Sequence, residues 1–286
     1  MSIFQKFNIY FYNNFHNGDV FYSKEFVRDI KNKIGSDHYY IHLNDFSILK
    51  DFDIKQIRDI TPDKTLSVSK KYDKLYINTW IGQQSSKYLK YNCSLKSNYL
   101  LYSDIYKTLE LEIEPISFYI PSVDFTKIIN INNYFYNKKS VLICNNDVHS
   151  GQSVNFDFDP IIDKISDIFK DVEFIITNNT KIIKPNVINA SHIIGLNYNN
   201  LLEISYLSTK TDTIIGRASG PYCFTHIRDN MNNPNKTFIA FSNDENEGKW
   251  VSETESQAKQ YWSNNYNIEY ITNYIQEIIK NKYTNG

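Results

Sequence analysis

Short apolar runs alternate along the chain with longer stretches in which apolar residues recur every three to four positions. The run Asn8–Tyr12 (NIYFY) predicts a buried strand, and Phe21–Ile34 predicts a helix with one apolar face. The same two patterns predict strands at Tyr39–Leu43 and Leu75–Asn78 and a helix at Asn98–Leu109. The first part of the chain therefore alternates strand and helix.

A second series of strands and helices follows a segment with little periodicity, which extends from Pro115 to about Lys139. Its first helix has a recognisable start signal, because Asp159 and Pro160 suit the first turn of a helix. The predicted strands are Ser140–Cys144, Val172–Thr177, Asp212–Ile215 and Thr237–Phe241. The predicted helices are Pro160–Phe169, Asn200–Thr209, Pro221–Arg228 and helical runs near Glu253–Trp262 and Ile268–Lys280.

Strands joined by helical crossovers form parallel sheets that helices cover on both faces. The two series therefore predict an α/β protein of two Rossmann-like domains, at 1–138 and 139–286, with 115–138 as the linker region. A chain of 286 residues that is 41% hydrophobic and 15% aromatic is long enough to bury two cores. One continuous doubly wound sheet is the alternative that this pattern leaves open.

Charge and cysteine content exclude several kinds of partner. A net charge of -1 argues against a nucleic-acid-binding surface. Three widely spaced cysteines, with no C-x-x-C pair, give no zinc-ligand pattern and fit a reducing compartment. We see neither a signal-peptide pattern nor an apolar run of about 18 residues. We therefore expect a cytoplasmic protein without a transmembrane segment, and peripheral contact with a membrane stays open.

The loop after the first strand contains a candidate base. Ligands of open α/β sheets bind beyond the carboxyl ends of the strands. Here Gly18 permits a tight turn, and Asp19 stands at the start of a helix. Asp19 is either a helix N-cap or a general base that removes a proton from an attacking hydroxyl. His16 is the other candidate base in this loop.

The loops of the second series favour a phosphate or a sugar. The polar loop after Ser140–Cys144 contains Asn145, Asn146, His149 and Ser150, whose side chains and backbone N–H groups suit phosphate contacts. Asn179 occupies the equivalent position after the next strand. These residues bind a ligand or merely form solvated loops. Neither G-x-G-x-x-G nor G-x-x-x-x-G-K-[ST] is present, which weakens the dehydrogenase, kinase and NTPase interpretations.

The sequence Arg217-Ala218-Ser219-Gly220-Pro221 leads from a predicted strand into a predicted helix. Ser219 and Gly220 offer a hydroxyl and an unhindered backbone N–H, and Pro221 suits the first turn of a helix. A helix N-terminus attracts anions, and Arg217 adds a charged, forked donor. The segment is therefore either an ordinary tight turn or a cradle for an anion such as a diphosphate.

The stretch Asn200–Pro221 (NLLEISYLSTKTDTIIGRASGP) resembles a segment of GT-B-fold glycosyltransferases. In that family the segment reads L-x-E-x-(small)-x-L-(small), followed by D-x-x-I-G-x-(D/N)-S-G-P. The heptosyltransferase-like enzymes of glycosyltransferase family 9 are the most similar. Near the start of the chain, NNFHNGDVFYSKEFVRDI resembles the first strand, the G-D loop and the first helix of that family. The resemblance implies two Rossmann-like domains with parallel sheets that face each other across a cleft, an acceptor domain followed by a nucleotide-sugar domain.

The resemblance implies a hexosyl- or heptosyl-type transferase of glycan biosynthesis. Such an enzyme moves a sugar from a nucleotide-diphosphate sugar to a hydroxyl of a glycan or of a lipid- or protein-linked acceptor. By motif, Asp19 matches the catalytic base, while Ser219 and Gly220 match the residues that bind the donor diphosphate. Asn145 and Asn146 fall near the phosphates. The resemblance further implies inversion, no metal, and no cofactor, because the nucleotide-sugar is a substrate.

Three departures from the family pattern keep other functions open. Ala218 stands in place of an acidic or amide residue, and Cys223 in place of a histidine. A lysine expected after Asn146 is absent, and His149 and Gln152 are the candidate substitutes. The alternatives are an inactive GT-B-like module that binds a nucleotide or glycan, and a nucleotide-sugar epimerase. Asp157-Phe158-Asp159 matches a D-x-D metal motif by its letters, but its position favours helix capping.

Overall fold

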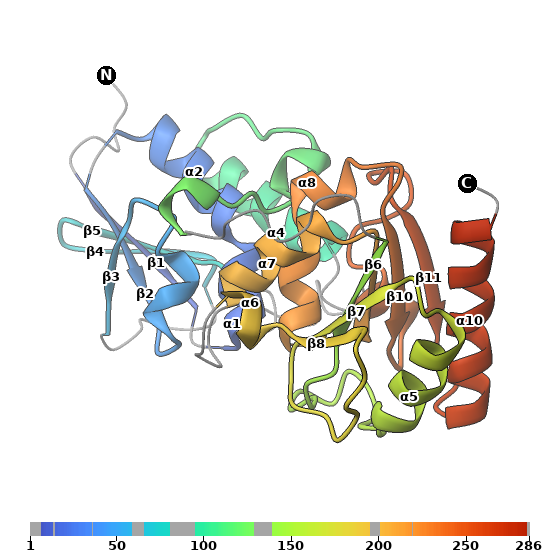
Figure 1. Cartoon of the computed structure of the whole chain (residues 1–286). Helices are drawn as coiled ribbons and strands as arrows, with labels where there is room; N and C mark the ends of the chain where they lie inside the picture. The colour runs from blue at the N-terminus through green and yellow to red at the C-terminus, as the bar shows by residue number, and fades with distance from the viewer. Residues whose placement is uncertain are drawn as a thin grey trace. The chain divides into compact units, whose positions relative to one another are not determined.

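The chain folds into two compact units, each with its own sheet (Figure 1). The computed structural model describes residues 7–13, 15–35, 37–58, 66–80, 95–128, 139–194, 201–218 and 220–284. The first unit comprises Met1–Ile128 together with Trp250–Glu255, and the second comprises Ile129–Lys249 with Ser256–Gly286. The chain thus returns briefly to the first unit before it completes the second.

The first unit is built on a five-stranded sheet with the order β3-β2-β1-β5-β4. Its strands are β1 (Asn8–Tyr12), β2 (His38–Ile41), β3 (Lys55–Ile57), β4 (Val68–Lys71) and β5 (Lys74–Asn78). The central strand β1 pairs in parallel with both β2 and β5. The edge strand β4 is antiparallel to β5, so the sheet is mixed. The tight turn between β4 and β5 contains Tyr72 at a φ of 56°. This left-handed conformation is more often adopted by glycine or asparagine.

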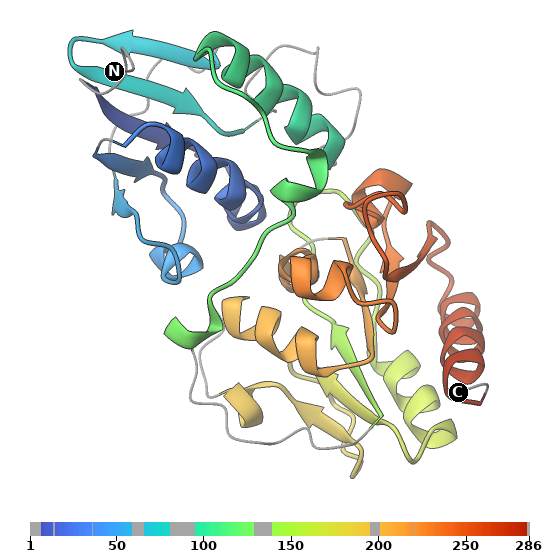
Figure 2. The same cartoon turned by 90° about the horizontal axis from the view of Figure 1, so that it is seen from above.

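Helices of the first unit pack on β1 through aromatic rings. They are α1 (Asn17–Tyr22), α2 (Lys24–Lys33) and α4 (Leu95–Thr108), with 3-10 turns η2 (Phe46–Leu49), η4 (Ile116–Tyr119) and η5 (Phe125–Lys127). Phe26 of α2 stacks on Tyr102 of α4 with ring centroids 4.2 Å apart, and meets Phe11 of β1 edge-on at 6.2 Å. Figure 2 shows α2 in blue and α4 in green. Aromatic packing of this kind supplies both buried area and a preferred geometry.

The single helix predicted at Phe21–Ile34 is two helices, because the chain breaks at Ser23. The Ser23 hydroxyl donates to the carbonyl of Val20 (2.8 Å) and lies 2.7 Å from the hydroxyl of Tyr40. A serine side chain that bonds to nearby backbone competes with the helical pattern. The break leaves α1 as a short helix directly after β1.

The second unit is built on a six-stranded, wholly parallel sheet with the order β11-β10-β9-β6-β7-β8. Its strands are β6 (Ser140–Cys144), β7 (Glu173–Ile176), β8 (Val187–Asn189), β9 (Thr213–Arg217), β10 (Thr237–Phe241) and β11 (Lys259–Ser263). The central strands β6, β9 and β10 are buried at every position. This is the pattern expected of parallel strands that are covered on both faces.

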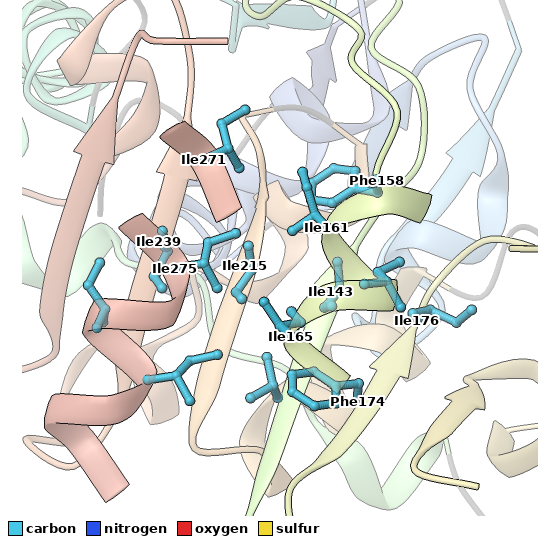
Figure 3. Packing of buried hydrophobic residues seen from close by; sticks show 14 of the residues in the cluster. Ile143, Phe158, Ile161, Ile165, Phe174, Ile176, Ile215, Ile239, Ile271 and Ile275 are labelled. Carbon is cyan, nitrogen blue, oxygen red and sulfur yellow. The ribbon is translucent and has the colours of Figure 1, made fainter. Parts of the chain in front are cut away.

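One face of this sheet is covered by α5 (Asp159–Ile168) and α10 (Ile268–Thr284), which lie side by side (Figure 1 and Figure 2). Figure 3 shows Ile161 and Ile165 of α5 and Ile271 and Ile275 of α10 beside strand residues such as Ile215. Each of these five side chains is fully buried. Their burial, at roughly 1.5–3 kcal/mol for each large apolar side chain, makes this cluster the main core of the unit.

The remaining short elements include α7 (Leu201–Lys210) and η6 (Gly220–Thr225), which pack together. The others are α6 (Ser191–Ile194), α8 (Arg228–Met231) and α9 (Glu245–Gly248). Gly216 of β9 explains how close η6 comes. A Cβ at that position would lie 2.7 Å from Cδ2 of Tyr222 and 2.9 Å from Cβ of Cys144. Only glycine therefore lets Tyr222 pack against the strand.

Two predictions about the second unit are wrong. The segment near Glu253–Trp262 was expected to be helical, but it contains the edge strand β11, which pairs in parallel with β10. The segment Pro221–Arg228 was expected to be one helix, but it is the 3-10 turn η6 followed by the separate helix α8. Both are short segments that follow the packing of the sheet rather than their own periodicity. None of the helices formed by the described residues has the length and apolar character that crossing a membrane requires.

Candidate active site

Two neighbouring strands of the first unit end in the same kind of turn. Asn13 follows β1, and its Oδ1 accepts a hydrogen bond from the backbone N–H of Phe15 (3.1 Å). Asn78 ends β5, and its Oδ1 accepts from the backbone N–H of Trp80 (3.0 Å). Because β1 and β5 are parallel, both turns lie at the carboxyl edge of the sheet. The rings of Phe15 and Trp80 stack there, with centroids 4.0 Å apart and planes 18° apart.

Asp19 lies in the first turn of α1, immediately beyond this edge. The N-cap position belongs to His16, so the alternative of Asp19 as the N-cap residue does not hold. The Asp19 carboxyl instead accepts from the backbone N–H of His16, as the acidic residue of a capping box does. This contact orients the carboxyl toward the loop between β1 and α1.

Burial raises the pKa of the Asp19 carboxyl to about 7. Desolvation is the dominant cause, and the backbone N–H groups of His16 and Asp19 oppose it. The indole N–H of Trp80 also lowers the pKa, although it has no partner of ordinary hydrogen-bond geometry within the described residues. A carboxyl with a pKa near the working pH is well matched to general-base chemistry.

Further polar groups line the same edge below Asp19. The hydroxyl of Tyr40 on β2 lies 2.7 Å from the Ser23 hydroxyl and 2.8 Å from the Thr79 hydroxyl. Burial raises the pKa of Tyr40, so this phenol stays protonated and neutral. Asn13 and Asn78 are fully buried, and within the described residues their amide Nδ2 atoms have no hydrogen-bond partner. The Asn13 amide nevertheless lies close enough to the Tyr40 hydroxyl to favour its ionised form, so Asn13 belongs to this buried polar group.

His16, the second candidate base, is an exposed residue whose ring lies 4.0 Å from the ring of Phe15. The planes are tilted by 36°, so His16, Phe15 and Trp80 form a series of three rings in contact. The contacts give His16 a place in an aromatic cluster beside Asp19. Its role as a base stays a prediction.

In the second unit, the predicted amides join the ends of neighbouring strands. Asn145 follows β6, and its side chain exchanges two hydrogen bonds with the backbone of Asn178, which follows β7 (2.8 and 3.2 Å). Oδ1 of Asn146 accepts from the hydroxyl of Thr177 (2.6 Å). Oδ1 of Asn179 accepts from the amide of Asn189 (3.1 Å). The parallel sheet therefore gathers these amides at one edge, where they hold the loops in place.

Arg217 ends β9 and is directed into the loop between β6 and α5. Its guanidinium donates to Oδ1 of Asn155 (2.7 Å), Oδ1 of Asp147 (3.1 Å) and the carbonyl of Asn145 (3.3 Å). It also lies 5.0 Å from the ring centroid of Phe156. The residue is only 3% exposed, and burial lowers its pKa despite the nearby Asp147 carboxylate. Arg217 thus anchors the loop, and direct contact with a diphosphate stays a prediction.

Most of the other residues that were predicted to bind the nucleotide-sugar occupy more open positions. His149 is exposed, and the hydroxyl of Ser150 donates to Oε1 of Gln152 (2.7 Å) within the same loop. Gly220 is exposed at φ +50°, a conformation that favours glycine, whereas Pro221 is buried. Ser219 lies outside the described residues.

An α-helix was predicted to begin at Pro221, but the structure has a 3-10 turn there. The element is a six-residue 3-10 turn, so the aligned dipoles of a longer α-helix are absent from this described segment. Any anion held here would depend on individual backbone N–H groups. Ala218 is buried, and its N–H donates to the carbonyl of Phe241 (3.0 Å), so this position is part of the sheet edge.

The D-x-D segment has a structural role at the start of α5. Oδ1 of Asp157 accepts from the backbone N–H of Asp159 (2.9 Å). The Asp159 carboxylate in turn accepts from the hydroxyl of Thr180 and the N–H of Lys181. Across the described part of the chain, no group of three or more His, Cys, Asp or Glu residues is arranged to hold a metal ion.

The sequence interpretation missed Phe15, Asn13 and Tyr40 at the Asp19 site. A signal for Phe15 was present, because an asparagine stands two residues before an aromatic residue at the end of both β1 and β5. Asparagine bonds readily to backbone two residues on, so this spacing is typical of such turns. No local signal indicated Tyr40, since its hydroxyl reaches the site across the sheet.

Comparison with known proteins gives similarity in structure alone. No protein-family model matches the sequence, and a search of curated proteins finds no significant match. A glycosyltransferase of family 9 from Veillonella parvula DSM 2008 is 10% identical with a TM-score of 0.51, over 96% of this chain and 89% of that one. The E. coli heptosyltransferase WaaC, solved with ADP, is 7% identical with a TM-score of 0.57, over 96% of this chain and 99% of that one.

A third similar structure belongs to another class of enzyme. A putative UDP-N-acetylglucosamine 2-epimerase from Listeria monocytogenes is 8% identical with a TM-score of 0.52, over 97% of this chain and 89% of that one. At such low identities the similarity shows the fold rather than the activity. The chain therefore has the mixed α/β fold of GT-B type that is found in family 9 glycosyltransferases and heptosyltransferases.

Proposed function

We propose that the protein is a glycosyltransferase that moves a sugar from a nucleotide-diphosphate sugar to an acceptor hydroxyl. In this proposal residues 1–138 hold the acceptor, a glycan or a lipid- or protein-linked sugar, and residues 139–286 hold the donor. The observation that carries it is Asp19, a shielded carboxyl of raised pKa at the carboxyl edge of β1 in a fold of GT-B type. The similar WaaC structure with ADP supports a nucleotide-linked donor.

Asp19 and the donor loops divide the chemistry between them. The Asp19 carboxylate takes the proton of the acceptor hydroxyl, and the oxygen attacks the anomeric carbon. The bond from that carbon to the diphosphate breaks, and the nucleoside diphosphate leaves with the electron pair. Backbone N–H groups near Gly220, with the hydroxyl of Ser219 and the amide of Asn146, stabilise the developing charge. A single displacement of this kind inverts the anomeric centre without a metal ion.

Replacing Asp19 tests the proposal. We expect Asp19→Asn to lower kcat/KM for transfer by about 100- to 10,000-fold, because the amide cannot accept the proton. The nucleotide-dependent rise in melting temperature should stay unchanged, since the donor site lies in the other unit. Asp53→Asn is the matched control, because its carboxylate belongs to the same unit and is 94% exposed.

The nucleotide-sugar donor is identified first. The melting temperature of the protein is measured in the presence of each common nucleoside diphosphate and nucleotide-sugar. A ligand that binds the folded state raises the melting temperature by mass action. The same panel, supplied with acceptors, gives the transfer assay. Equal transfer by the wild type and Asp19→Asn would overturn the assignment of the base. A flat response to every nucleotide would overturn the donor assignment.

A nucleotide-sugar epimerase is the second candidate, because the Listeria enzyme has a similar fold over nearly the whole chain. An epimerase changes the sugar of its nucleotide-sugar without an acceptor hydroxyl. Proton NMR of the nucleotide-sugar incubated with protein alone therefore separates the two activities. A new sugar nucleotide without acceptor indicates the epimerase, and binding without any conversion indicates an inactive module.

A further inference from the structure

We infer that His16, Phe15 and Trp80 form an acceptor subsite that binds the apolar face of a neutral sugar ring beside Asp19. We call these three rings the aromatic wall. The inference rests on the proposed function, because it names the chemistry of the acceptor that Asp19 would activate. It concerns only the first unit, which contains all four residues.

The aromatic wall is held by the backbone rather than by chance packing. Phe15 and Trp80 are far apart in sequence, but each follows a strand-end asparagine whose Oδ1 bonds to its backbone N–H (3.1 and 3.0 Å). Thr79 fixes the register, since its N–H donates to the carbonyl of Tyr12 (3.1 Å). Two parallel strands thus present the two rings together, with centroids 4.0 Å apart.

The aromatic wall remains partly open to solvent. Phe15 is 40% exposed, and His16 is also exposed. Elsewhere in the unit, aromatic residues such as Phe11, Phe26 and Tyr102 are fully buried. Phe15 stands between the other two rings, each with its centroid 4.0 Å away, so the faces left for a ligand are the outer faces of His16 and Trp80. Partly exposed rings at a strand edge are typical of binding surfaces rather than of cores.

The aromatic wall adjoins the candidate base, since the backbone N–H of Asp19 donates to the carbonyl of His16 (3.1 Å). The backbone N–H of His16 bonds to the Asp19 carboxyl, and the indole of Trp80 lies close enough to affect its ionisation. We therefore expect a molecule that rests on these rings to have its edge near the carboxyl. This is the arrangement that a reacting hydroxyl needs, because a base must lie within hydrogen-bond reach of the proton it removes.

The chemistry of the site selects a neutral sugar. One face of a pyranose ring presents C–H bonds, whose partial positive charge suits the negative face of an aromatic ring. The ring edge presents hydroxyls, which suit the Asp19 carboxyl. The residues that form the wall and its two turns, among those described, include no lysine or arginine. Among these described residues there is thus no cationic lysine or arginine to balance an anionic sugar beside the Asp19 carboxylate.

Fluorine NMR can detect this binding without turnover. The chain has three tryptophans, Trp80, Trp250 and Trp262, so protein labelled with 5-fluorotryptophan should give three signals. The Trp80 signal is assigned by its loss in Trp80→Phe. We expect neutral methyl glycosides of glucose, galactose or N-acetylglucosamine to shift the Trp80 signal while the other two stay unchanged.

Variants of Phe15 test the role of the stack. We expect Phe15→Leu to weaken the glycoside response by about 3- to 10-fold, because it keeps an apolar side chain but removes the ring that holds those of His16 and Trp80 in a stack. Phe15→Tyr should retain it. Tyr72→Leu is the control, since Tyr72 is an aromatic residue of the same unit that is 85% exposed and lies in the β4–β5 turn. Unchanged Trp250 and Trp262 signals show that each variant is folded.

The possible outcomes separate this inference from the proposed function. A Trp80 response to glycosides without any transferase activity supports the wall and removes the function. Transfer that depends on Asp19, with the same acceptor KM in Phe15→Leu, overturns the wall and leaves the function. The inference also fails if no neutral glycoside shifts Trp80, or if uridine, adenosine or glucuronic acid shifts it more strongly.

Discussion

The Asp19 carboxyl is costly to ionise in the folded protein, because burial raises its pKa from 3.8 to about 7. In the unfolded chain the carboxyl loses its proton at much lower pH. Between these two values the unfolded state releases a proton that the folded state retains. This group therefore lowers the free energy of unfolding as the pH rises from about 4 to about 7, after which its effect is constant. Selection for stability alone would remove such a group.

We expect Asp19→Asn to be more stable than the wild type at pH 8 and about equally stable near pH 3, below both pKa values. The amide keeps an acceptor for the N–H of His16 but never ionises. The difference at pH 8 should be on the order of 2 kcal/mol, below the full value of the pKa shift because part of the residue is exposed. Urea unfolding of both proteins at the two pH values measures it. A difference that does not change with pH would contradict the raised pKa.

At the scale of elements, a single buried side chain, Arg217, organises the loop between β6 and α5. Arg217 bonds to three residues of this loop, Asn145, Asp147 and Asn155. Asn155 in turn bonds to both backbone groups of Val148 (2.7 and 3.1 Å). The loop that contains His149 and Ser150 is therefore held in shape by Arg217, which was predicted to bind the ligand, and by Asn155, which was not.

We expect Arg217→Met to destabilise the second unit by about 1–3 kcal/mol. The reason is that the side-chain oxygen of Asn155 and the carbonyl of Asn145 each lose a hydrogen bond from the buried guanidinium. Asp147→Asn should cost less than about 1 kcal/mol, since the Asp147 side chain is 68% exposed and its ion pair is screened by water. Urea denaturation gives both values. Equal costs for the two variants would indicate that the ion pair, rather than the contacts of Arg217 with the Asn155 amide and the Asn145 carbonyl, holds the loop.

At the same scale, the strands that could be predicted from the sequence differ in composition and in place in the sheet from those that could not. Asn8–Tyr12, Ser140–Cys144 and Thr237–Phe241 were predicted with the bounds that the structure has, because each is a continuous apolar run between polar residues. The short strands β3, β4 and β8 were missed, and β11 was taken for a helix. These lie at or next to sheet edges and include residues such as Lys, Gln and Asn, so their pairing with a neighbour decides their structure.

At the scale of the whole molecule, the first unit includes a segment from the far end of the sequence. Trp250 is 4% exposed, and its ring stacks on Tyr22 with centroids 3.8 Å apart and planes 7° apart. Its carbonyl accepts from the N–H of Leu95 at the start of α4 (3.1 Å). The core of the first unit is therefore complete only after most of the second unit has been synthesised.

We expect Trp250→Ala to destabilise the first unit by about 3–5 kcal/mol, the cost of removing a large buried ring. Hydrogen exchange should quicken in α1 and α4 while β6, β9 and β10 keep their protection. Trp262→Ala, in the second unit, should show the opposite distribution because its indole donates to Ser242 (2.8 Å). Faster exchange throughout the chain in both variants would contradict two separately stabilised cores.

The sequence by itself determined the alternation of strands and helices, the parallel sheet of the second unit and the position of Asp19 after the first strand, but not the antiparallel pair β4–β5. These follow from local patterns, because the period of apolar residues and the ends of strands are visible in short windows. Only the tertiary structure decided that Phe15 and Trp80 meet, that Arg217 faces a loop, and that Trp250 belongs to the first unit. Each of these joins residues distant in sequence, and burial and strand pairing act on neighbours in space.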